Sequence, residues 1–577
     1  MTQRFEVWAP YAAAVELVTD SGRVEMASEG GGWFEVEADV EPGTDYRFSL
    51  DGGDGLPDPR SPWQPEGPHG PSRTVDHDVF RWTDDDWKGA PLASAIVYEL
   101  HVGTFTPKGT FDGAIERLDH LVDLGVTAVE LMPVAEFPGE HGWGYDGVSL
   151  FAPHHAYGGP DGLKRLVDAC HGRGLAVIMD VVYNHLGPDG NYLGSYGPYF
   201  TDRYSTPWGD AVNFDGPGSP GVRAFVVENA LMWLDDYHCD GLRIDAVHAI
   251  LDTSALHILE EIAGNVERLS GHLGRQLFLI AESDLNDPRI VQRREAGGYG
   301  IDAQWSDDLH HALHAVITGE SNGYYSDFGD LEHVATALEQ AFVYAGRYSP
   351  YRNRVHGRGP VGIPGYRFLG YMQTHDQVGN RAGGERLGEI AGPDLAKVAA
   401  AVVLTSPFVP MLFQGEEWGA SSPFLYFTDH TDPELGRAVS EGRKREFEAF
   451  GWDPERIPDP QERSTFERSK LDWTEPEREP HADIVEWYRD LIELRRSLPD
   501  LGDGSLDQVT TFFDEDQRAL IVQRGDVSLT CNFSDDYAKI PAERGSTTRQ
   551  LLASAEDPEW DESGLVLPPT SATIWTR

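Results

Sequence analysis

The sequence predicts an α/β protein built on a (β/α)8 barrel, a TIM barrel, with a β-sandwich domain before it and a β domain after it. Eight short apolar runs alternate with helical stretches in the middle of the chain. Both ends instead contain strand-like segments separated by Gly, Pro and Asp. A chain of 577 residues with 40% hydrophobic residues is long enough to bury more than one core. We therefore expect three domains.

The first domain, residues 1–90, is predicted to be an immunoglobulin-like β-sandwich. Its strand-like segments are short and lie between turn residues: RFEVWAP, AVELVT, GGWFEVEADV and TDYRFSL. A Pro-rich stretch, GLPDPRSPWQPEGPHGPS, leads out of it. The acidic stretch TDDDWKGAP then marks the boundary with the next domain.

The second domain, residues 91–498, is predicted to be the barrel, with insertions. Its candidate strands are AIVYELHVG, AVELMPV, LAVIMDVVYNH, DGLRIDA, LFLIAES, DAQWSDD, FLGYMQTHD and FVPMLFQGEE. Stretches such as DGAIERLDHLVDLG carry apolar residues three and four apart and end at a Gly, as outer helices do. The last domain, residues 499–577, again contains strand-like segments, RALIVQRGDVSLTCNFS and SATIWTR. It is predicted to be a small β domain.

The charge balance is strongly acidic, with 96 Asp and Glu against 46 Lys and Arg and a formal net charge of -50. Such a chain repels phosphates, so no nucleic-acid partner is expected. Its self-repulsion is costly at low ionic strength but largely screened at molar salt, where the Debye length is about 3 Å. We interpret the composition as halophilic. The alternative is an acidic surface that only keeps the protein soluble.

Three scattered cysteines, Cys170, Cys239 and Cys531, have no CxxC or metal-ligand spacing. Neither a disulfide framework nor a zinc site is therefore indicated. The segment MTQRFEVWAP lacks a basic region followed by an apolar core, and no apolar run reaches the roughly 18 residues of a membrane span. We expect a cytoplasmic protein with no membrane partner.

Polar side chains collect at the ends of five predicted barrel strands. In DGLRIDAVHAI, Arg243 and Asp245 are two residues apart and should project from the same face. Strand ends of a barrel surround one mouth, so these groups should meet there. Several convergent carboxylates suit glycoside cleavage, in which one group protonates the leaving oxygen and another attacks or stabilises the sugar centre. Metal-assisted hydrolysis is the competing chemistry, but no HExxH or similar ligand pair is present. The five sets are Asp180 with Asn184 and His185, Arg243 with Asp245, Glu282, Asp308, and His375 with Asp376.

With these residues in place, the chain resembles the α-amylase family of retaining glycoside hydrolases. DVVYNH, GLRIDAVHA, IAESD and QTHDQVGN match its four signature regions in order and approximate spacing. The resemblance implies that Asp245 is the nucleophile, Glu282 the general acid and base, and Asp376 the third carboxylate. It also implies that Arg243, His185 and His375 hold the nucleophile and the sugar. No cofactor and no metal ion are predicted.

Simple electrostatics agrees with these implied roles. Arg243 should favour the ionised form of Asp245, whereas Glu282 has to stay protonated near neutrality, which needs partial desolvation or nearby negative charge. A retaining mechanism also requires the carboxyl groups of Asp245 and Glu282 to lie about 5 to 5.5 Å apart.

Two further motifs match less specifically. In GWGYDG, Tyr145 and Asp146 correspond to a sugar-stacking tyrosine and an acidic partner, although a structural turn is the alternative interpretation. Asp180 and Asn184 are expected to brace the site rather than contact sugar. In some family members the Asn helps to bind calcium, but the sequence shows no complete calcium site.

The sandwich segment VWAPYAAAVELV is similar to the module of branching, debranching and trehalose-releasing members. DAQWSDDLHHALHAVITGESNGYYSDFG and YSPYRNRVHGR are similar to the trehalose-releasing branch of this family. The implied substrate is maltooligosyltrehalose, cut at the α-1,4 bond next to its terminal trehalose unit. The implied functional partner is the maltooligosyltrehalose synthase that supplies it. His248 would contact the first leaving-side glucose. Candidates for the trehalose side are Trp305, Asp308, His310 and Tyr351, whose alternative interpretation is a His-rich helix start and an ordered surface loop.

Three alternatives stay open at this point. A glycogen branching or debranching enzyme of the same family would share the three carboxylates and the sandwich. A plain maltooligosaccharide hydrolase would release glucose or maltose instead of trehalose. A non-catalytic binding protein on the same barrel is the third alternative, and the intact set Asp245, Glu282 and Asp376 argues against it.

Overall fold

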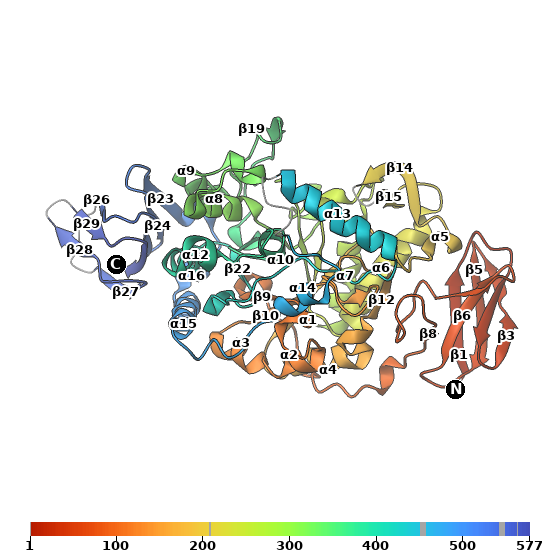
Figure 1. The fold of residues 1–577 in the computed structure, drawn as a ribbon. Coiled ribbons are helices and arrows are strands. Elements are labelled where there is room, and N and C mark those ends of the chain that lie inside the picture. The colour runs from red at the N-terminus through yellow and green to blue at the C-terminus, as the bar shows by residue number, and fades with distance from the viewer. Residues whose placement is uncertain (1, 207–208, 450–456, 542–547, 562–563) are drawn as a thin grey trace.

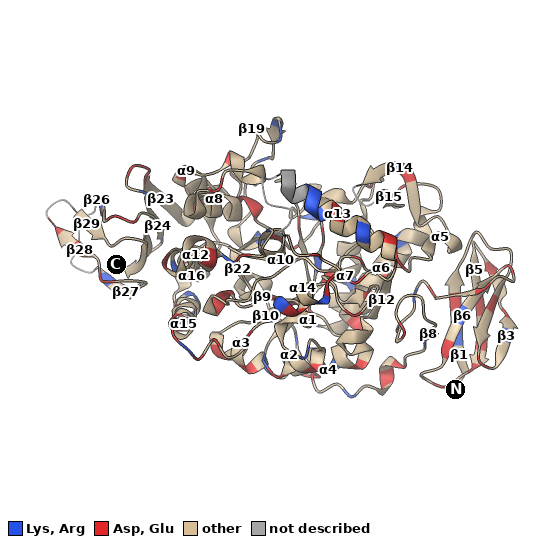
Figure 2. Cartoon of the chain, in the orientation of Figure 1, with Lys and Arg blue, Asp and Glu red and all other residues tan. Residues whose placement is uncertain are grey.

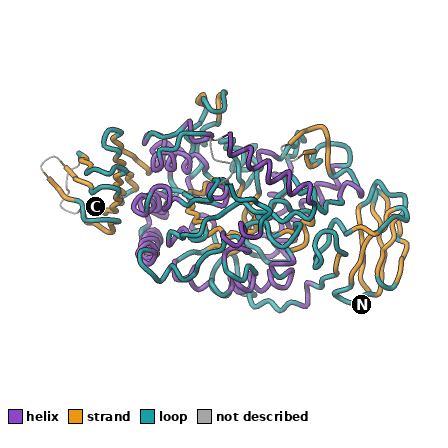
Figure 3. Tube along the Cα trace, in the orientation of Figure 1, coloured by secondary structure: helices purple, strands orange, loops and turns teal. Residues whose placement is uncertain are grey.

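The computed structural model describes residues 2–206, 209–449, 457–541, 548–561 and 564–577. Its three parts follow one another along the molecule (Figure 1). The N-terminal sheets lie at one end, the barrel lies in the middle and the C-terminal sheets lie at the other end. Figure 3 shows helices gathered around the central strands, whereas the two ends consist mainly of strands and loops.

Eight parallel strands close into the barrel in chain order, and the last strand pairs with the first. Every one of the eight lies within a run that the sequence predicted as a strand, so the predicted TIM barrel is confirmed. Their residues are buried throughout, which explains why the runs are mostly apolar rather than alternating. The strands are β9 (Val97–Leu100), β10 (Ala128–Leu131), β13 (Ala176–Val181), β16 (Gly241–Ile244), β17 (Phe278–Ala281), β18 (Ala303–Trp305), β21 (Phe368–Gly370) and β22 (Val409–Phe413).

The outer layer consists of amphipathic helices that bury one face against the strands. α3 ends at Gly125, which has φ 98°, a left-handed conformation that glycine adopts without steric cost. The main outer helices are α3 (Leu118–Leu124), α4 (Gly159–His171), α6 (Ser219–Asp235), α7 (Ile258–Leu273), α8 (Asp307–Thr318), α12 (Pro393–Thr405) and α15 (His481–Ser497). Shorter helices lie in the connections: α1 (Val102–Phe105), α2 (Phe111–Ile115), α5 (Leu193–Tyr196), α10 (His375–Gly379), α11 (Leu387–Ala391), α14 (Arg463–Arg468) and α16 (Pro499–Gly502).

The connection between β17 and β18 departs from the regular barrel. Between Glu282 and Asp302, all of which the structure describes, the only helical element is one 3₁₀ turn over Arg294–Ala296. Pro288 and a run of glycines interrupt this segment, and Gly297 and Gly300 adopt positive φ angles. One of the eight outer positions therefore lacks its α-helix.

Several elements are inserted into the connections on the barrel's outer side. Two small ribbons follow early strands: β11 (Ala135–Glu136) with β12 (Ser149–Pro153), and β14 (Phe200–Thr206) with β15 (Gly209–Val212). Between β18 and β21, α9 (Leu331–Gln340) precedes the hairpin β19 (Arg347–Ser349) and β20 (Arg354–His356), which projects from the molecule in Figure 1. The long helix α13 (Pro433–Ala449) follows β22.

Two antiparallel sheets form the N-terminal part. β1 (Thr2–Trp8), β5 (Trp33–Asp39) and β4 (Ala27–Gly30) form one sheet. The other contains β3 (Gly22–Glu25), β2 (Val15–Thr19), β6 (Asp45–Leu50) and β7 (Gly55–Leu56), with β8 (Ser72–Arg73) paired to β6. Phe5 of the first sheet meets Tyr46 of the second at a ring separation of 5.0 Å, so the sheets share one core.

The acidic stretch that follows the N-terminal sheets is bound to the barrel. Asp84 Oδ2 lies 2.7 Å from His171 Nδ1, and His171 Nε2 lies 3.0 Å from Asp240 Oδ2. The indole of Trp87 stacks on His171 and donates a hydrogen bond to Asp240 Oδ1 at 2.7 Å. The stretch is therefore anchored through the buried His171 at the end of α4.

Two antiparallel sheets also form the C-terminal part. One contains β23 (Val509–Asp514), β24 (Ala519–Arg524), β25 (Val527–Asn532), β30 (Ser571–Thr576) and β27 (Arg549–Ala553). The other contains β26 (Ala538–Ile540), β29 (Gly564–Leu567) and β28 (Glu559–Asp561). Arg524 of β24 donates to the carbonyl oxygens of Thr405 and Ser406 at 2.8 and 2.7 Å. A cation at the end of α12 satisfies carbonyls that the helix leaves unpaired.

Acidic residues lie on all three parts of the molecule, as Figure 2 shows. Within the described residues, no helix is both long and apolar enough to cross a membrane. Cys170, Cys239 and Cys531 are buried free thiols.

Candidate active site

A single buried arginine organises the mouth of the barrel. Arg243, at the end of β16, is fully buried, and its Nη1 donates to both oxygens of Asp180 at 2.8 and 2.7 Å and to Asp245 Oδ1 at 2.9 Å. Its Nη2 lies 2.8 Å from Glu282 Oε2. Three carboxyl groups from three neighbouring strands thus share one guanidinium, which presents its nitrogens in a fixed planar fork.

The chain turns sharply directly after Asp245. Ala246 adopts φ 39°, a left-handed conformation that is uncommon outside glycine, and its backbone N–H donates to Glu282 Oε2 at 2.7 Å. Asn184 Nδ2 donates to Asp245 Oδ2 at 2.6 Å. The left-handed turn therefore directs an amide at Glu282 while Asp245 is held from two sides.

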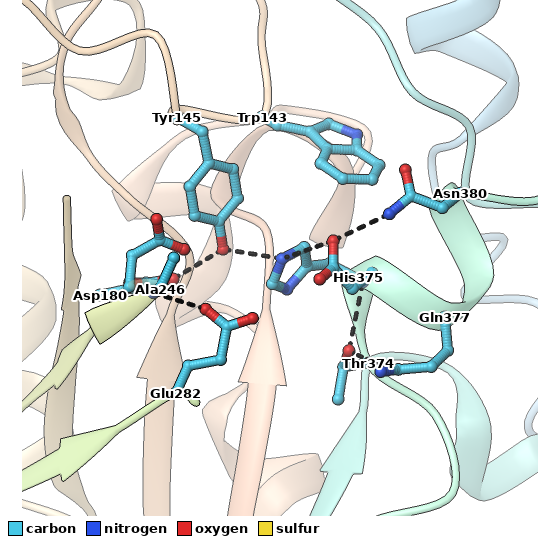
Figure 4. Close-up of polar contacts among 12 residues, drawn as sticks. Trp143, Tyr145, Asp180, Ala246, Glu282, Thr374, His375, Gln377 and Asn380 are labelled. Carbon is cyan, nitrogen blue, oxygen red and sulfur yellow. Dashed lines mark hydrogen bonds and ion pairs between the residues drawn. The ribbon is translucent and has the colours of Figure 1, made fainter. Parts of the chain in front are cut away.

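A second group of side chains extends from Asp180 to the start of α10 (Figure 4). The hydroxyl of Tyr145 donates to Asp180 Oδ2 at 2.7 Å and lies 2.8 Å from His375 Nε2. His375 Nδ1 lies 2.5 Å from Glu99 Oε1. Burial by itself lowers the pKa of His375, but the carboxylates of Glu99 and Asp376 outweigh it and raise the pKa to about 9.

Asp376 lies in the first turn of α10, beside His375. Its Oδ1 is 3.6 Å from His375 Nε2 and accepts a hydrogen bond from Asn380 Nδ2 at 3.0 Å. Thr374 caps the helix by accepting from the Asp376 N–H. The side chain of Asp376 is 40% exposed, and those of Glu282 and Asp245 are 16% and 11% exposed. The three carboxyl groups therefore come together at the mouth and remain open to solvent, whereas Arg243 is closed off.

Asp180 and His185 have pKa values shifted by burial. Burial raises the pKa of Asp180 to about 7; Arg243 opposes this shift and Asp245 adds to it. Burial lowers the pKa of His185 to about 4, so its imidazole is neutral near pH 7. His185 Nε2 lies 3.0 Å from the carbonyl oxygen of Tyr145 and its Nδ1 contacts Asn184. His185 thus links the Tyr145 loop to the strand end that carries Asn184.

Three other predicted residues lie outside this hydrogen-bonded network. Asp146 is half-buried and its nearest ionic partner is His430, 3.9 Å away. His248 is exposed, two residues beyond the turn at Ala246. Tyr351 is 50% exposed in the hairpin between β19 and β20, and its backbone N–H donates to Asp327.

Trp305, Asp308 and His310, the residues expected on the trehalose side, are buried in the structure. Trp305 is buried and packs against the guanidinium of Arg243, 4.3 Å from its ring centre. Asp308 is buried and its Oδ2 accepts three hydrogen bonds, from Asn286 Nδ2 and from the N–H groups of Val343 and Tyr344. His310 is buried with both ring nitrogens in contact, at Met372 O and Tyr325 OH. Asp308 and His310 are thus enclosed and hydrogen-bonded within the protein, and Trp305 lies against Arg243.

Sequence reasoning missed several groups around the mouth. Glu99 and Glu130 are buried in β9 and β10, at facing positions of the ladder. Trp143 packs edge-on against His375 at 5.4 Å. Asp307, not Asp308, faces the mouth side: Tyr371 OH donates to its Oδ1 at 2.5 Å, and burial with the negative charge of Glu282 raises its pKa to about 8, against the Tyr371 hydrogen bond. The sequence signal that could have revealed Glu99 and Glu130 is a Glu inside each of two predicted barrel strands.

Among the described residues, one group brings three possible metal ligands together. Glu136, His154 and His155 place one ligand atom each within 4.8 Å of one another. Glu136 Oε1 lies 2.7 Å from His155 Nδ1 and 3.2 Å from His154 Nδ1. These separations are those of an ion-pair cluster at the β11–β12 ribbon, and none of the mouth carboxylates belongs to it.

Comparisons with known proteins agree with this geometry. Residues 73–198 match the family model described as alpha amylase, catalytic domain, and residues 504–574 match a domain of unknown function, DUF3459. The malto-oligosyltrehalose trehalohydrolase of Arthrobacter ramosus is 54% identical over 86% of this chain and 88% of its own. The protein of the same name from a Rhizobium species is 48% identical over 99% of this chain and 97% of its own. A solved structure from Salmonella typhimurium, assigned as an alpha amylase, superposes with a TM-score of 0.92 and 40% identity, covering 100% of this chain and 97% of that one.

Proposed function

The chain belongs to the malto-oligosyltrehalose trehalohydrolases of the α-amylase family, and from this membership we propose that it hydrolyses maltooligosyltrehalose and releases trehalose. The bond cut is the α-1,4-glucosidic bond next to the terminal trehalose unit. The other product is a maltooligosaccharide shortened by that unit. The observation that carries the chemistry is the shared guanidinium of Arg243, which holds Asp245 and Glu282 side by side at the barrel mouth.

We propose that Asp245 is the nucleophile and Glu282 the general acid and base. Asp245 attacks the anomeric carbon as the bond to the leaving oxygen breaks, and Glu282 gives its proton to that oxygen, which leaves as a trehalose hydroxyl. Glu282 then takes a proton from water, whose oxygen attacks the anomeric carbon and frees the Asp245 carboxylate. Asp376 supports the positively charged transition state from the α10 side.

Retention is supported by how the two reactive carboxyl groups are held. A retaining enzyme needs them about 5 to 5.5 Å apart, whereas an inverting enzyme needs room for a water between them. Asp245 and Glu282 bind two nitrogens of the same guanidinium, at 2.9 and 2.8 Å. Such a shared anchor favours the shorter separation.

Candidates for sugar contacts divide into two groups. Tyr145, His375 and His185 surround the reactive carboxyl groups and are proposed for the sugar that is attacked, with Asp146 at the edge. Exposed His248, just beyond the nucleophile, is proposed for the first leaving-side glucose, and Tyr351 remains a candidate for the trehalose side. Arg243 acts through the carboxyl groups, because its guanidinium is fully buried.

The setting proposed for this enzyme is a salt-rich cytoplasm, supported by the net charge of -50 and by three buried free thiols. Its substrate ends in a non-reducing trehalose unit. An enzyme that converts the reducing end of a maltooligosaccharide must therefore act before it. We propose functional coupling to maltooligosyltrehalose synthase on this chemical ground.

The test offers the purified protein maltooligosyltrehalose and the linear maltooligosaccharide of equal length. Products are separated by chromatography, and the anomeric configuration of the first-formed maltooligosaccharide is read by proton NMR before mutarotation. We expect trehalose from the first substrate, little cleavage of the second and an α-anomer. Release of glucose or maltose from both substrates would show a plain hydrolase, and formation of new α-1,6 links would show a branching enzyme. A β-anomer would show an inverting mechanism.

A further inference from the structure

Glu99 is a buried carboxylate that contacts His375 through both of its carboxyl oxygens. Its Oε1 lies 2.5 Å from His375 Nδ1, and its Oε2 accepts a hydrogen bond from the His375 backbone N–H at 3.0 Å. Glu99 is 1% exposed and belongs to β9, whereas His375 begins α10 after β21. The contact therefore fixes the start of the helix that carries Asp376 to a distant strand of the barrel.

The hydrogen bonds around His375 require a proton on each ring nitrogen. Tyr145 has a single hydroxyl hydrogen, and it is donated to Asp180 Oδ2 at 2.7 Å. His375 Nε2, 2.8 Å from the same hydroxyl oxygen, must then be a donor. Nδ1 faces a carboxylate oxygen of Glu99 and is a donor as well. An imidazole that donates from both nitrogens is the imidazolium.

The charged surroundings of His375 point in the same direction. Glu99 and Asp376 favour the imidazolium, whereas burial and the positive charge of Arg243 oppose it. Burial lowers the pKa of His101 to about 3, so that neighbour is neutral near pH 7. The titratable groups around His375 are Glu99, Glu130, His101, Tyr145, Arg243 and Asp376.

We propose that Glu99 is a positioning residue that keeps His375 in its imidazolium form, so that its Nε2–H fixes the Tyr145 hydroxyl on Asp180. This places Glu99 at the start of a continuous chain of contacts that runs through His375, Tyr145 and Asp180 to Arg243. The inference rests on the proposed function for its kinetic consequence. The protonation of His375 itself can be measured without substrate.

Glu130 provides a matched control. It faces Glu99 across the β9–β10 ladder, is equally buried, and neither of its carboxyl oxygens has a hydrogen-bond partner among the described residues. Burial, followed by the negative charge of Glu99, raises its pKa well above the usual range. Glu130→Gln therefore alters an equally buried carboxyl group that makes no hydrogen bond to His375, whereas Glu99→Gln replaces the carboxylate that binds His375, at nearly constant volume.

The direct test is an NMR titration of protein labelled with ¹³C at histidine Cε1, with the His375 signal assigned by its loss in His375→Gln. We expect the unsubstituted protein and Glu130→Gln to hold the imidazolium at pH 7.5. In Glu99→Gln the titration should move down by about 1 to 3 pH units. A neutral His375 in the unsubstituted protein at pH 7.5 overturns the proposal, and so does an unchanged titration in Glu99→Gln. The first criterion applies even where Glu99→Gln does not fold.

The kinetic test follows trehalose release between pH 5 and 10. We expect the alkaline limb of kcat/KM to shift to lower pH in Glu99→Gln, with activity recovering towards pH 5.5, where the imidazole is protonated without help. A purely structural role would lower activity equally at every pH, and that result overturns the proposal. Absence of trehalose release from the unsubstituted protein would instead refute the proposed reaction and leave the NMR result to decide the role of Glu99.

Discussion

Arg243 determines the geometry of the candidate site at the level of single residues. Its guanidinium is enclosed by Trp305 on one face and bound to Asp180, Asp245 and Glu282 on its edges. A buried charge is tolerated only when it is paired and hydrogen-bonded, and here three carboxyl groups provide that pairing. A lysine could not replace it, because an ammonium is a point charge without the planar fork.

Replacing the proposed nucleophile should separate chemistry from folding. Asp245→Asn keeps an acceptor oxygen for Arg243 and nearly the same volume, but it cannot form the covalent intermediate. We expect trehalose release to fall by at least about a thousandfold, with a far-UV circular dichroism spectrum and unfolding midpoint close to those of the unsubstituted protein. Asp535→Asn, at an exposed position of the C-terminal domain, should retain full activity. Turnover within tenfold of normal in Asp245→Asn would remove that residue from the mechanism.

The surroundings of Asp308 and His310 show where sequence reasoning stops. The strand end before them was located correctly. Asp308 is bound by Val343 and Tyr344, and His310 by Met372, all from later segments of the chain. No local pattern reveals such partners. The carboxyl groups proposed to react could be predicted because each follows its own apolar strand, whatever lies around it.

At the level of elements, the barrel strands could be predicted from the sequence, but the absence of a helix between β17 and β18 was not predicted. Each strand lies within a short, buried, mostly apolar run next to turn residues, which is a strong local signal. The segment after Glu282 instead contains Pro288 and the glycines up to Gly300, which interrupt helical hydrogen bonding. The acidic stretch around Asp84 was predicted as a simple boundary, and the buried His171 that anchors it is distant in sequence.

The anchor at His171 makes a testable contribution to stability. His171→Gln leaves Asp240 buried without its ionic partner, and breaking a buried pair costs about 3 kcal/mol. We expect a clearly lower midpoint of thermal unfolding at pH 6. His272→Gln, at an exposed position near the end of α7, should leave the midpoint unchanged.

The same anchor should be sensitive to pH. Burial alone lowers the pKa of His171, but the hydrogen-bonded carboxylates of Asp240 and Asp84 raise it above its ordinary value. Its contribution to stability is therefore fully present below about pH 6.5 and is lost as pH rises through the raised pKa. The difference in unfolding midpoint between the unsubstituted protein and His171→Gln should shrink from pH 6 to pH 9.5. An equal difference at both pH values would contradict an ionic anchor.

At the level of the whole molecule, the net charge of -50 should dominate the response to salt. Acidic residues lie on all three parts, so repulsion acts across the entire chain rather than within one domain. We expect the midpoint of thermal unfolding to rise steadily from 20 mM to 2 M KCl as screening increases. Sucrose of matched osmolality controls for general exclusion effects. A midpoint that is the same at both KCl concentrations would leave the acidic composition as a solubility feature only.

The three parts are joined by polar anchors as well as apolar contacts. Arg60, between β7 and β8 of the N-terminal part, pairs with Glu228 of α6, and Arg524 binds the end of α12 from the C-terminal sheet. Both flanking parts are thereby attached to outer helices of the barrel, and the N-terminal part also contacts the loop after β13 through His69 and Asp189.

The shared guanidinium also leaves an electrical imbalance at the centre of the enzyme. Glu282 holds a proton as the proposed general acid, which leaves the carboxylates of Asp180, Asp245 and Asp376. Arg243 and His375 are the two cations in direct contact with these groups, so one negative charge is unbalanced. A resting glucose unit is uncharged and does nothing to restore neutrality. An oxocarbenium-like sugar carries the missing positive charge for the brief moment of bond exchange. The mouth of the barrel is thus electrostatically more complementary to the positively charged transition state than to the neutral sugar before and after it.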